Sequence, residues 1–404
     1  RVTRQIKTGA DAQHLVTHSL HEYDAIGRVM RIKKRVGQSN INSGTLGVEK
    51  TVAVQEYDAL GQLKRKQLGT KPGSSSALET LTYDYNIRGW LLGVNRNFLN
   101  PNLPAVPGST HWFGFELLYD KADNVASSPQ WTNAQYNGNI RSQIWRTAGD
   151  GVSRNHHYLY DAANRLLTAQ YTQRNKQGMW DDSELNFSFW TDHSGYNNPD
   201  TAYDLNGNIR QFGHRGFVPG ATTLGQMNVD VLFYHYFPLS NRLQRVHDYI
   251  SETAPGRGDF ADVHTGETDY GYDENGNLLK DLNKRIGTTT ANGITYNHLN
   301  LPQQITVYKP DGSQKGTITY AYDAAGAKLR KTVTETGVSL NGTTTTVTTI
   351  THYIGGAVYE SKSYTPLPSG YTAYNFRLQF AAHEEGRLRA LRSQPQQHPS
   401  ALVY

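Results

Sequence analysis

The chain has 404 residues and no cysteine, which excludes disulfides, cysteine-ligated metals and a thiol nucleophile. Aromatic residues make up 11%, and Tyr (26) outnumbers Phe (12), so the chain can bury a large core and disorder throughout is excluded. The formal net charge is +5, but the 40 basic residues are interleaved with 35 acidic ones, and no apolar run approaches the roughly 20 residues of a spanning helix; we predict neither a nucleic-acid partner nor membrane insertion.

Short segments of alternating character predict β-strands along the chain. Clear examples are residues 52–57, 63–66 and 318–322, where polar and apolar residues alternate as they do in strands with one buried face. The basic run at 31–35 is interpreted as the solvated face of a strand. Glycine is frequent (38 residues) and charged residues are few (19%), which favours turns and strands over helices.

One phrase recurs in chain order: an aromatic residue, Asp, two residues, Gly, one residue and an aliphatic residue. Intervals of 20 to 50 residues, such as the 34 residues from Tyr23 to Tyr57, are typical of repeat architectures. The full copies contain Tyr23, Asp24, Gly27, Tyr57, Asp58, Gly61, Tyr203, Asp204, Gly207, Tyr272, Asp273, Gly276, Tyr322, Asp323 and Gly326. Weaker copies begin at Tyr83-Asp84 (with Gly89), Tyr119-Asp120, Tyr160-Asp161 and Tyr296-Asn297.

The phrase predicts a β-hairpin turn. Asp favours the first position of a type I turn, where its carboxylate accepts a backbone N–H two residues on. Gly three positions later can adopt positive φ, which produces a type I turn followed by a bulge. In the copy that begins at Tyr160, Asn164 takes the Gly position, and Asn is the next residue most tolerant of that conformation. A lone hairpin is marginal in water, so we predict that the hairpins pair into one extended antiparallel sheet.

The repeat tyrosines leave two interpretations open. A buried Tyr ring supplies apolar area, while its hydroxyl needs a hydrogen-bond partner or water. The sheet therefore either faces a polar-lined space, or packs the rings in a core where their hydroxyls find partners. Between the strands, Pro and Gly predict irregular segments at 98–110, 251–268 and 393–400, and the Thr-rich residues 341–351 predict a hairpin.

The repeats resemble the YD repeats of the RHS family, which is found in bacterial polymorphic toxins, in the C component of insecticidal toxin complexes and in animal teneurins. Residues 85–91, 135–140 and 383–387 resemble RHS proteins of the Bacteroidota in particular. The resemblance covers nearly the whole chain, taken as a single repeat region over 1–404. It implies an all-β fold in which the hairpins form one long spiralling antiparallel sheet, part of a hollow shell around a C-terminal toxin.

The resemblance also implies further segments. A core-associated segment, a self-cleaving aspartyl protease and the variable toxin should follow the repeats, so we expect this chain to be a fragment that lacks them. The implied function is structural and non-catalytic: to enclose the polypeptide's own C-terminal toxin or effector until delivery, through a type VI or type IX secretion system, from a secreted or cell-surface bacterial protein.

Enzyme motifs are lacking in the sequence. There is no phosphate-binding loop, no zinc-binding His-Glu-x-x-His helix and no nucleophile elbow. Asp204 and Asp273 begin phrases that share letters with a calcium loop, but Gly stands at position four and not six, so a turn is predicted. We therefore predict no catalytic residue, no metal ligand and no cofactor, and structural roles for the repeat residues.

A second function stays open from the sequence, a cell-surface module that binds carbohydrate or protein. Exposed Trp side chains could stack on surface glycans, whereas the alternative is that they fill hairpin cores. The Trp residues concerned are Trp90, Trp112, Trp131, Trp145, Trp180 and Trp190.

Overall fold

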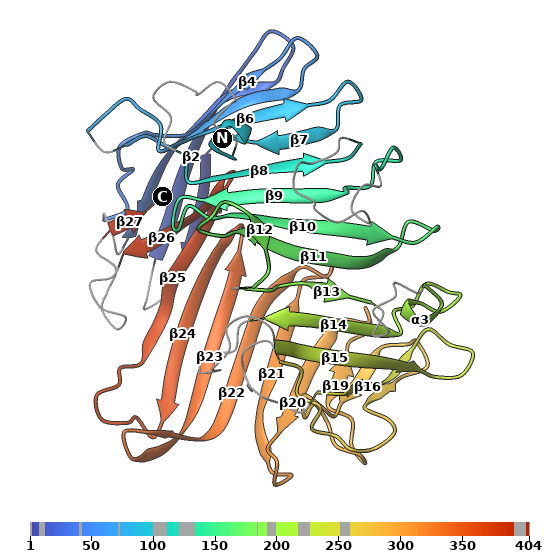
Figure 1. Ribbon diagram of the computed structural model, residues 1–404. Helices are drawn as coiled ribbons and strands as arrows, with labels where there is room; N and C mark the ends of the chain where they lie inside the picture. Colours follow the sequence, from blue (N-terminus) through green and yellow to red (C-terminus); the bar gives the residue numbers. More distant parts are fainter. Residues whose placement is uncertain are drawn as a thin grey trace. The chain divides into compact units, whose positions relative to one another are not determined.

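Antiparallel β-strands make up nearly all of the regular structure (Figure 1), so the predicted all-β fold is confirmed. The computed structural model describes residues 2–7, 13–39, 43–71, 73–99, 111–120, 134–183, 185–191, 199–216, 227–250, 259–391 and 401–403. The described chain divides into two compact units. Unit 1 comprises Arg1–Val54 and Thr268–Tyr404, and unit 2 comprises Gln55–Glu267.

Unit 2 is a ladder of strands that pair in chain order. Consecutive strands are hydrogen-bonded to each other. The exception is β12, which pairs with β11 alone, so that β11 pairs onward with β13. Its strands are β5 (Leu63–Leu68), β6 (Glu79–Tyr85), β7 (Leu91–Val94), β8 (Phe113–Leu118), β9 (Ser142–Thr147), β10 (Ser153–Tyr160), β11 (Leu166–Arg174), β12 (Trp180–Asp181), β13 (Phe189–Trp190), β14 (Gln211–Gly216), β15 (Met227–Tyr236) and β16 (Leu243–Asp248). Two single-turn helices, α2 (Arg96–Leu99) and α3 (Pro199–Ala202), interrupt the connections.

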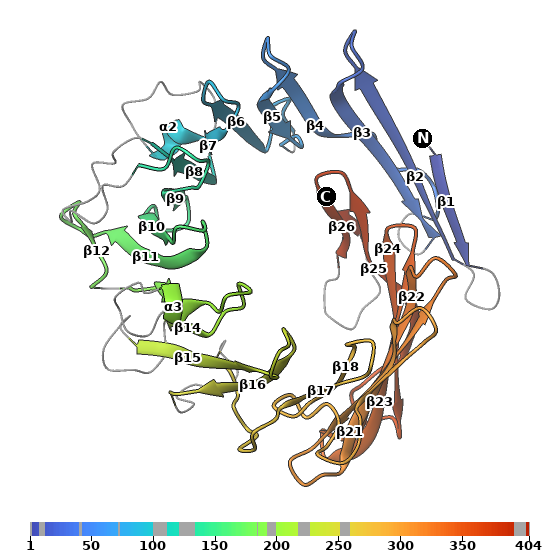
Figure 2. The same cartoon turned by 90° about the vertical axis from the view of Figure 1, so that its right-hand side faces the viewer.

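Unit 1 contains ladders from both ends of the chain (Figure 2). The first holds β1 (Val2–Lys7), β2 (Gln13–Tyr23), β3 (Val29–Gln38) and β4 (Lys50–Tyr57), whose last residues belong to unit 2. A two-stranded ladder holds β17 (Tyr270–Tyr272) and β18 (Leu278–Asp281). The longest holds β19 (Ile294–Tyr296), β20 (Pro302–Tyr308), β21 (Gln314–Tyr322), β22 (Lys328–Leu340), β23 (Thr343–Ile354), β24 (Ala357–Thr365), β25 (Tyr374–His383), β26 (Gly386–Leu391) and β27 (Ala401–Val403).

The connections follow the chemistry of the loops. The Thr-rich hairpin joins β22 to β23 through Asn341 and Gly342, whose φ values of 46° and 76° are those of a two-residue type I′ turn. Residues 259–268 form no strand, and the predicted loop at 98–110 begins with the last residues of α2. The segments 100–110, 251–258 and 393–400 lie outside the described residues. Among the described helices, none is long and apolar enough to cross a membrane.

Candidate functional site

The Asp residues of the full copies each begin a hairpin turn. In the copy at Asp58, the backbone N–H donates to the carbonyl of Gln62 at 2.9 Å, and Oδ1 accepts the N–H groups of Leu60 and Gln62 at 2.9 and 2.8 Å. Gly61 has a φ of 83°, which an L-residue adopts only at a cost. The same two hydrogen bonds to the residue four positions on are made by Asp24, Asn86, Asp161, Asp204, Asp273, Asn297 and Asp323.

The glycine position of the turns is equally regular. Its φ lies between 83° and 87° in Gly27, Gly61, Gly207, Gly276 and Gly326. Asn takes this position in two turns, with φ values of 63° at Asn164 and 55° at Asn300. The side chain of Asn164 accepts hydrogen bonds from Asn137 at 2.6 Å and Asn139 at 2.9 Å, both from another turn. An Asn at this position therefore closes its own turn and also links two turns.

One weaker copy is displaced by two residues from its predicted position. The turn there begins at Asn86, which donates to Trp90 and accepts from it, and Tyr85 takes the aromatic position. Tyr83 and Asp84 lie within β6, opposite Val94 and Gly93 of β7. Tyr83-Asp84 therefore does not form the turn. The cause is that Asn accepts the same backbone N–H groups as Asp, so a copy without Asp still makes the turn.

The hydroxyls of the repeat tyrosines bind backbone of the preceding hairpin. Tyr160, for example, donates to the carbonyl of Ile140 at 2.7 Å, and Tyr85 donates to Leu63 at 3.1 Å. Several of the accepting residues, such as Leu63, Leu91 and Leu278, are the first residues of strands that follow turns. Such contacts run from Tyr85 to Leu63, Tyr119 to Leu91, Tyr160 to Ile140, Tyr203 to Leu166, Tyr296 to Leu278 and Tyr322 to Pro302, and Tyr236 of β15, outside the copies named above, donates in the same way to Ile209.

These contacts favour the second of the two interpretations of the tyrosines, rings packed in the sheet with paired hydroxyls. Burial, and then the neighbouring Tyr158, raises the pKa of Tyr160 to about 12, so its hydroxyl stays protonated and can donate. Two copies differ. Tyr57 donates to the side chain of Gln55 at 2.7 Å, and Tyr23 is 58% exposed with its hydroxyl 3.5 Å from Nδ1 of His21.

Unit 1 contains a buried contact between the two ends of the chain, which we call the clasp (Figure 2). The strands β2 and β3 pack there against β24, β25 and β26. The rings of Tyr359 and Phe376 stack at its centre with centroids 4.5 Å apart. Its apolar residues are all at most 8% exposed: Leu15, Val36, Ala357, Tyr359, Phe376, Leu378, Ala381 and Leu388.

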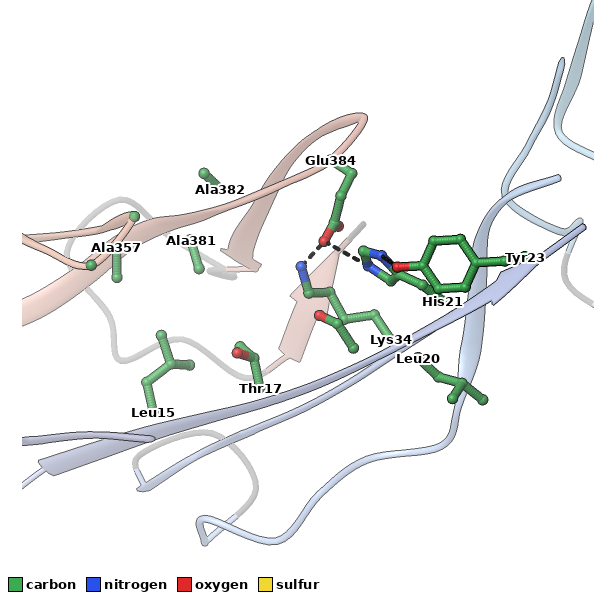
Figure 3. A pocket seen from close by; sticks show the side chains of 13 residues that line it. Leu15, Thr17, Leu20, His21, Tyr23, Lys34, Ala357, Ala381, Ala382 and Glu384 are labelled. Carbon is green, nitrogen blue, oxygen red and sulfur yellow. Dashed lines mark hydrogen bonds and ion pairs between the residues drawn. The ribbon is translucent and has the colours of Figure 1, made fainter. Parts of the chain in front are cut away.

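Charged side chains lie at one end of the clasp. Nζ of Lys34, which is only 5% exposed, lies 3.0 Å from Oε2 of Glu384, and Nε2 of His21 lies 3.6 Å from Oε1 of the same carboxylate (Figure 3). Burial raises the pKa of Glu384, but its own backbone N–H and Lys34 lower it more, so the pKa lies below its ordinary value. Burial and then Lys34 hold the pKa of His383 below its ordinary value as well.

A cavity of about 530 Å³ lies against these charges and is lined from both sides of the clasp. Thr17, Ser19 and His21 come from β2, and Ala357 and Ala382 from the C-terminal strands (Figure 3). The lining offers one carboxylate and one imidazole, and the carboxylate is already bound by Lys34. This set falls short of the three or four protein ligands of a zinc site, so we assign the clasp a role in joining strands.

The sequence analysis missed the clasp and interpreted one of its residues wrongly. Lys34 belongs to the basic run interpreted as a solvated face, yet its side chain is buried. A signal was present: Ile32, Lys34 and Val36 alternate along β3 and are all buried, so Lys34 shares the inward face of the strand. Glu384 lies in the turn between β25 and β26, inside the phrase at 383–387 that carried the Bacteroidota resemblance.

Most of the Trp side chains pack within the sheet. Trp145 contacts the rings of His156 and Tyr171, with centroids 5.1 and 6.1 Å away. Trp90, Trp180 and Trp190 are partly covered and each lies near an Arg guanidinium. Of the Trp residues that the structure describes, Trp112 alone is strongly exposed, at 66%, and Trp131 lies outside those residues. A glycan-stacking surface of several Trp is therefore not assembled by the described residues.

Known proteins provide a likeness at the level of the fold. No protein-family model and no curated protein matches the chain. The chain is similar to the crystal structure of TcdB2-TccC3-Cdc42, with a TM-score of 0.52 and 15% sequence identity over 98% of this chain and 17% of that chain. This likeness supports an RHS-like fold. A porin-like protein from Bacteroides uniformis aligns at a TM-score of only 0.20, with 11% identity over 89% of this chain and 96% of that chain, which carries no argument.

Proposed function

We propose that this chain is a section of a protein wall that encloses a toxin, with no catalytic role of its own. The observation that carries the proposal is the series of hairpins paired in chain order, which aligns with the TcdB2-TccC3 chain over 98% of this chain. Neighbouring hairpins are tied through tyrosine hydroxyls, and the ends of unit 1 are joined by the clasp. Such a surface resists fraying at its hairpins, as a barrier to proteases must.

The finer parts of the proposal concern cargo and export. The cargo is the C-terminal toxin or effector of the same polypeptide, and the whole is secreted from a bacterium, of the Bacteroidota, by a type VI or type IX route. The parent gene would then continue past Tyr404 into a variable domain. Detection of the polypeptide outside the cells, and its loss when one of the two routes is inactivated, tests the export.

Limited proteolysis of the full polypeptide tests the enclosure. We expect the segment that follows the repeats to survive protease when the wall is intact. Leu388→Asp places a charge in the clasp, where Leu388 is fully buried, and should expose that segment to cleavage. Leu205→Asp is the matched control, because Leu205 at a hairpin tip is fully exposed and the same charge should change nothing.

The repeats themselves are followed in the same digestion, so that unfolding is distinguished from opening. In the Leu388→Asp variant, resistant repeats together with a cleaved downstream segment support the proposal. If the protease also digests the repeats of the Leu388→Asp variant, the milder Glu384→Gln variant is used in its place. The proposal would be overturned if protease cleaved the downstream segment as readily in the intact protein as in either variant. A gene that ends at Tyr404 would overturn it as well.

A further inference from the structure

An acidic cluster lies in unit 2, far from the clasp residues in sequence and separate from the repeat turns. Asp230 lies in β15, Asp248 ends β16, and Asp259 follows in the irregular segment after that strand. One carboxylate oxygen from each lies within 4.8 Å of the others. Asp230 and Asp248 are only 4% and 8% exposed, so two of the three carboxylates are removed from water.

Asp248 has an oxygen that the described protein leaves unpaired. Its Oδ1 accepts the backbone N–H groups of Val231 and Ile250, both at 3.1 Å. Its Oδ2 is buried and has no hydrogen-bond partner among the described residues. An unpaired buried carboxylate oxygen is costly, so its position beside two further carboxylates indicates a ligand.

Asp230 contacts a backbone N–H and an imidazole. Oδ1 of Asp230 accepts the N–H of Phe260 at 2.7 Å, and its Oδ2 lies 3.2 Å from Nδ1 of His214, outside good hydrogen-bond geometry. A fourth carboxylate, Asp262, accepts the N–H of Asp248 at 3.1 Å and lies 2.8 Å from Nδ1 of His247. Among the described residues, no Lys or Arg forms an ion pair with Asp230 or Asp248.

The carboxylates of the cluster repel one another. Burial raises the pKa of Asp230 most. Repulsion from Asp248 and Asp259 raises it further, while the N–H of Phe260 and the nearby His214 lower it in part. Burial likewise raises the pKa of Asp248, the backbone N–H groups of Val231 and Ile250 lower it in part, and repulsion from Asp259 and Asp262 raises it further. A cation at the common centre of the carboxylates would remove this repulsion.

We propose that Asp230, Asp248 and Asp259 bind one calcium ion. Calcium prefers carboxylate, carbonyl and water oxygens at about 2.3–2.6 Å, so two of its ligands can lie up to roughly 5 Å apart. The oxygens of the cluster, all within 4.8 Å of one another, fit this range, and three carboxylates exceed the one or two through which magnesium is usually bound. A neighbouring cavity of about 290 Å³, lined by Asp248, Asp262 and Thr265 among others, has room for water ligands.

The ion would tie an irregular segment to the sheet. Asp259 and Phe260 belong to the segment after β16, and the other two ligands belong to adjacent strands, β15 and β16. Calcium binding would therefore stabilise unit 2 without any change in the repeat turns. The inference is independent of the enclosure proposed above, because it concerns binding by this chain alone.

Thermal unfolding of the 404-residue chain after chelator treatment tests the site. We expect calcium chloride to raise the unfolding midpoint by about 5 °C or more once its concentration is roughly 100-fold above the dissociation constant. A calorimetric titration should give one calcium per chain. Asp248→Asn should abolish the calcium-induced rise and leave the calcium-free midpoint equal to or above that of the unmodified chain, because it removes one of the repelling charges.

Asp281→Asn is the matched control, since Asp281 is also buried (5% exposed) with a pKa raised by burial, but lies in β18 of unit 1. This variant should keep the full calcium-induced rise. If Asp248→Asn does not fold, Asp259→Asn at the less buried ligand carries the same test. No calcium response in the unmodified chain, a full response in the folded Asp248 variant, or tighter binding of magnesium or zinc than of calcium would each overturn the assignment.

Discussion

One side-chain oxygen organises each turn of the repeat phrase. Oδ1 of Asp58 accepts two backbone N–H groups, which the tight turn would otherwise leave to solvent. Asn performs the same role through its amide oxygen at Asn86 and Asn297. The requirement at this position is therefore an acceptor on a short side chain, and the negative charge is not needed.

This requirement leads to a prediction at Asp58. Asp58→Ala removes the acceptor for Leu60 and Gln62, and we expect the free energy of unfolding to fall by about 1–2 kcal/mol. Asp58→Asn keeps the acceptor and should lie within about 0.5 kcal/mol of the unmodified chain. Urea unfolding followed by circular dichroism measures both. Equal losses in the two variants would contradict the role of the oxygen.

At the scale of the element, the hairpins are joined by more than their strand ladders. The tyrosine at the end of one strand reaches across to the carbonyl that begins a strand of the preceding hairpin, as Tyr296 does to Leu278 at 2.7 Å. The ring covers the sheet, and the hydroxyl pairs a backbone group. A Phe at this position would keep the first contribution and lose the second.

Tyr160→Phe tests the second contribution. Removal of the donor to Ile140 should lower the free energy of unfolding by about 1 kcal/mol, whereas Tyr136→Phe, at a ring that is 67% exposed, should have little effect. Chemical denaturation of both variants under one condition provides the comparison. An equal effect at the two positions would show that the hydroxyl of Tyr160 contributes nothing specific.

The raised pKa of Tyr160 adds an alkaline dependence. Its pKa of about 12 in the folded chain exceeds the ordinary value of about 10, so the folded state holds the proton more tightly than the unfolded state. This contribution is full below about pH 10 and is lost as the pH rises toward 12. Stability of the unmodified chain should therefore fall more steeply above pH 10 than that of Tyr160→Phe, which denaturation at pH 9 and pH 11 measures.

At the scale of the whole chain, the clasp joins strands from opposite ends of the sequence. Lys34 and Glu384 are 350 residues apart and form its ion pair, in which the lysine is buried and the carboxylate is partly exposed. Acid weakens the stabilising contributions of both Glu384 and its neighbour His383. The pKa of Glu384 and that of His383 are lowered in the folded chain, so their contributions are present at neutral pH and are lost as the pH falls, first for the imidazole and then for the carboxylate.

Glu384→Gln tests this dependence. Because Lys34 is buried, loss of its charged partner should lower the free energy of unfolding by about 1–3 kcal/mol at pH 7.5, and the further loss on going to pH 4 should be smaller than in the unmodified chain. Glu335→Gln is the control, since its pair with Lys315 is exposed and spans 4.0 Å. Parallel pH profiles for Glu384→Gln and the unmodified chain would contradict the assignment.

Local features were predictable to the extent that they depend on neighbouring residues. The turn phrase and the alternation around it predicted hairpins and the all-β class, because a turn needs only an acceptor, a residue tolerant of positive φ and two flanking strands. The turn predicted at Asp84 begins two residues later, at Asn86. The prediction relied on Asp, whereas the turn requires only a side-chain acceptor. The partner of each tyrosine hydroxyl was left open, since it lies on another hairpin.

The repeated hairpins could thus be predicted from the residue pattern, because the interactions of each turn span fewer than ten residues and recur in each copy. The burial of Lys34 against Glu384 and the convergence of Asp230, Asp248 and Asp259 became visible in the folded chain alone. The physical reason is that burial and electrostatic pairing depend on which strands meet in space. A local pattern of charge and turn residues carries no information about a partner brought near by the intervening chain.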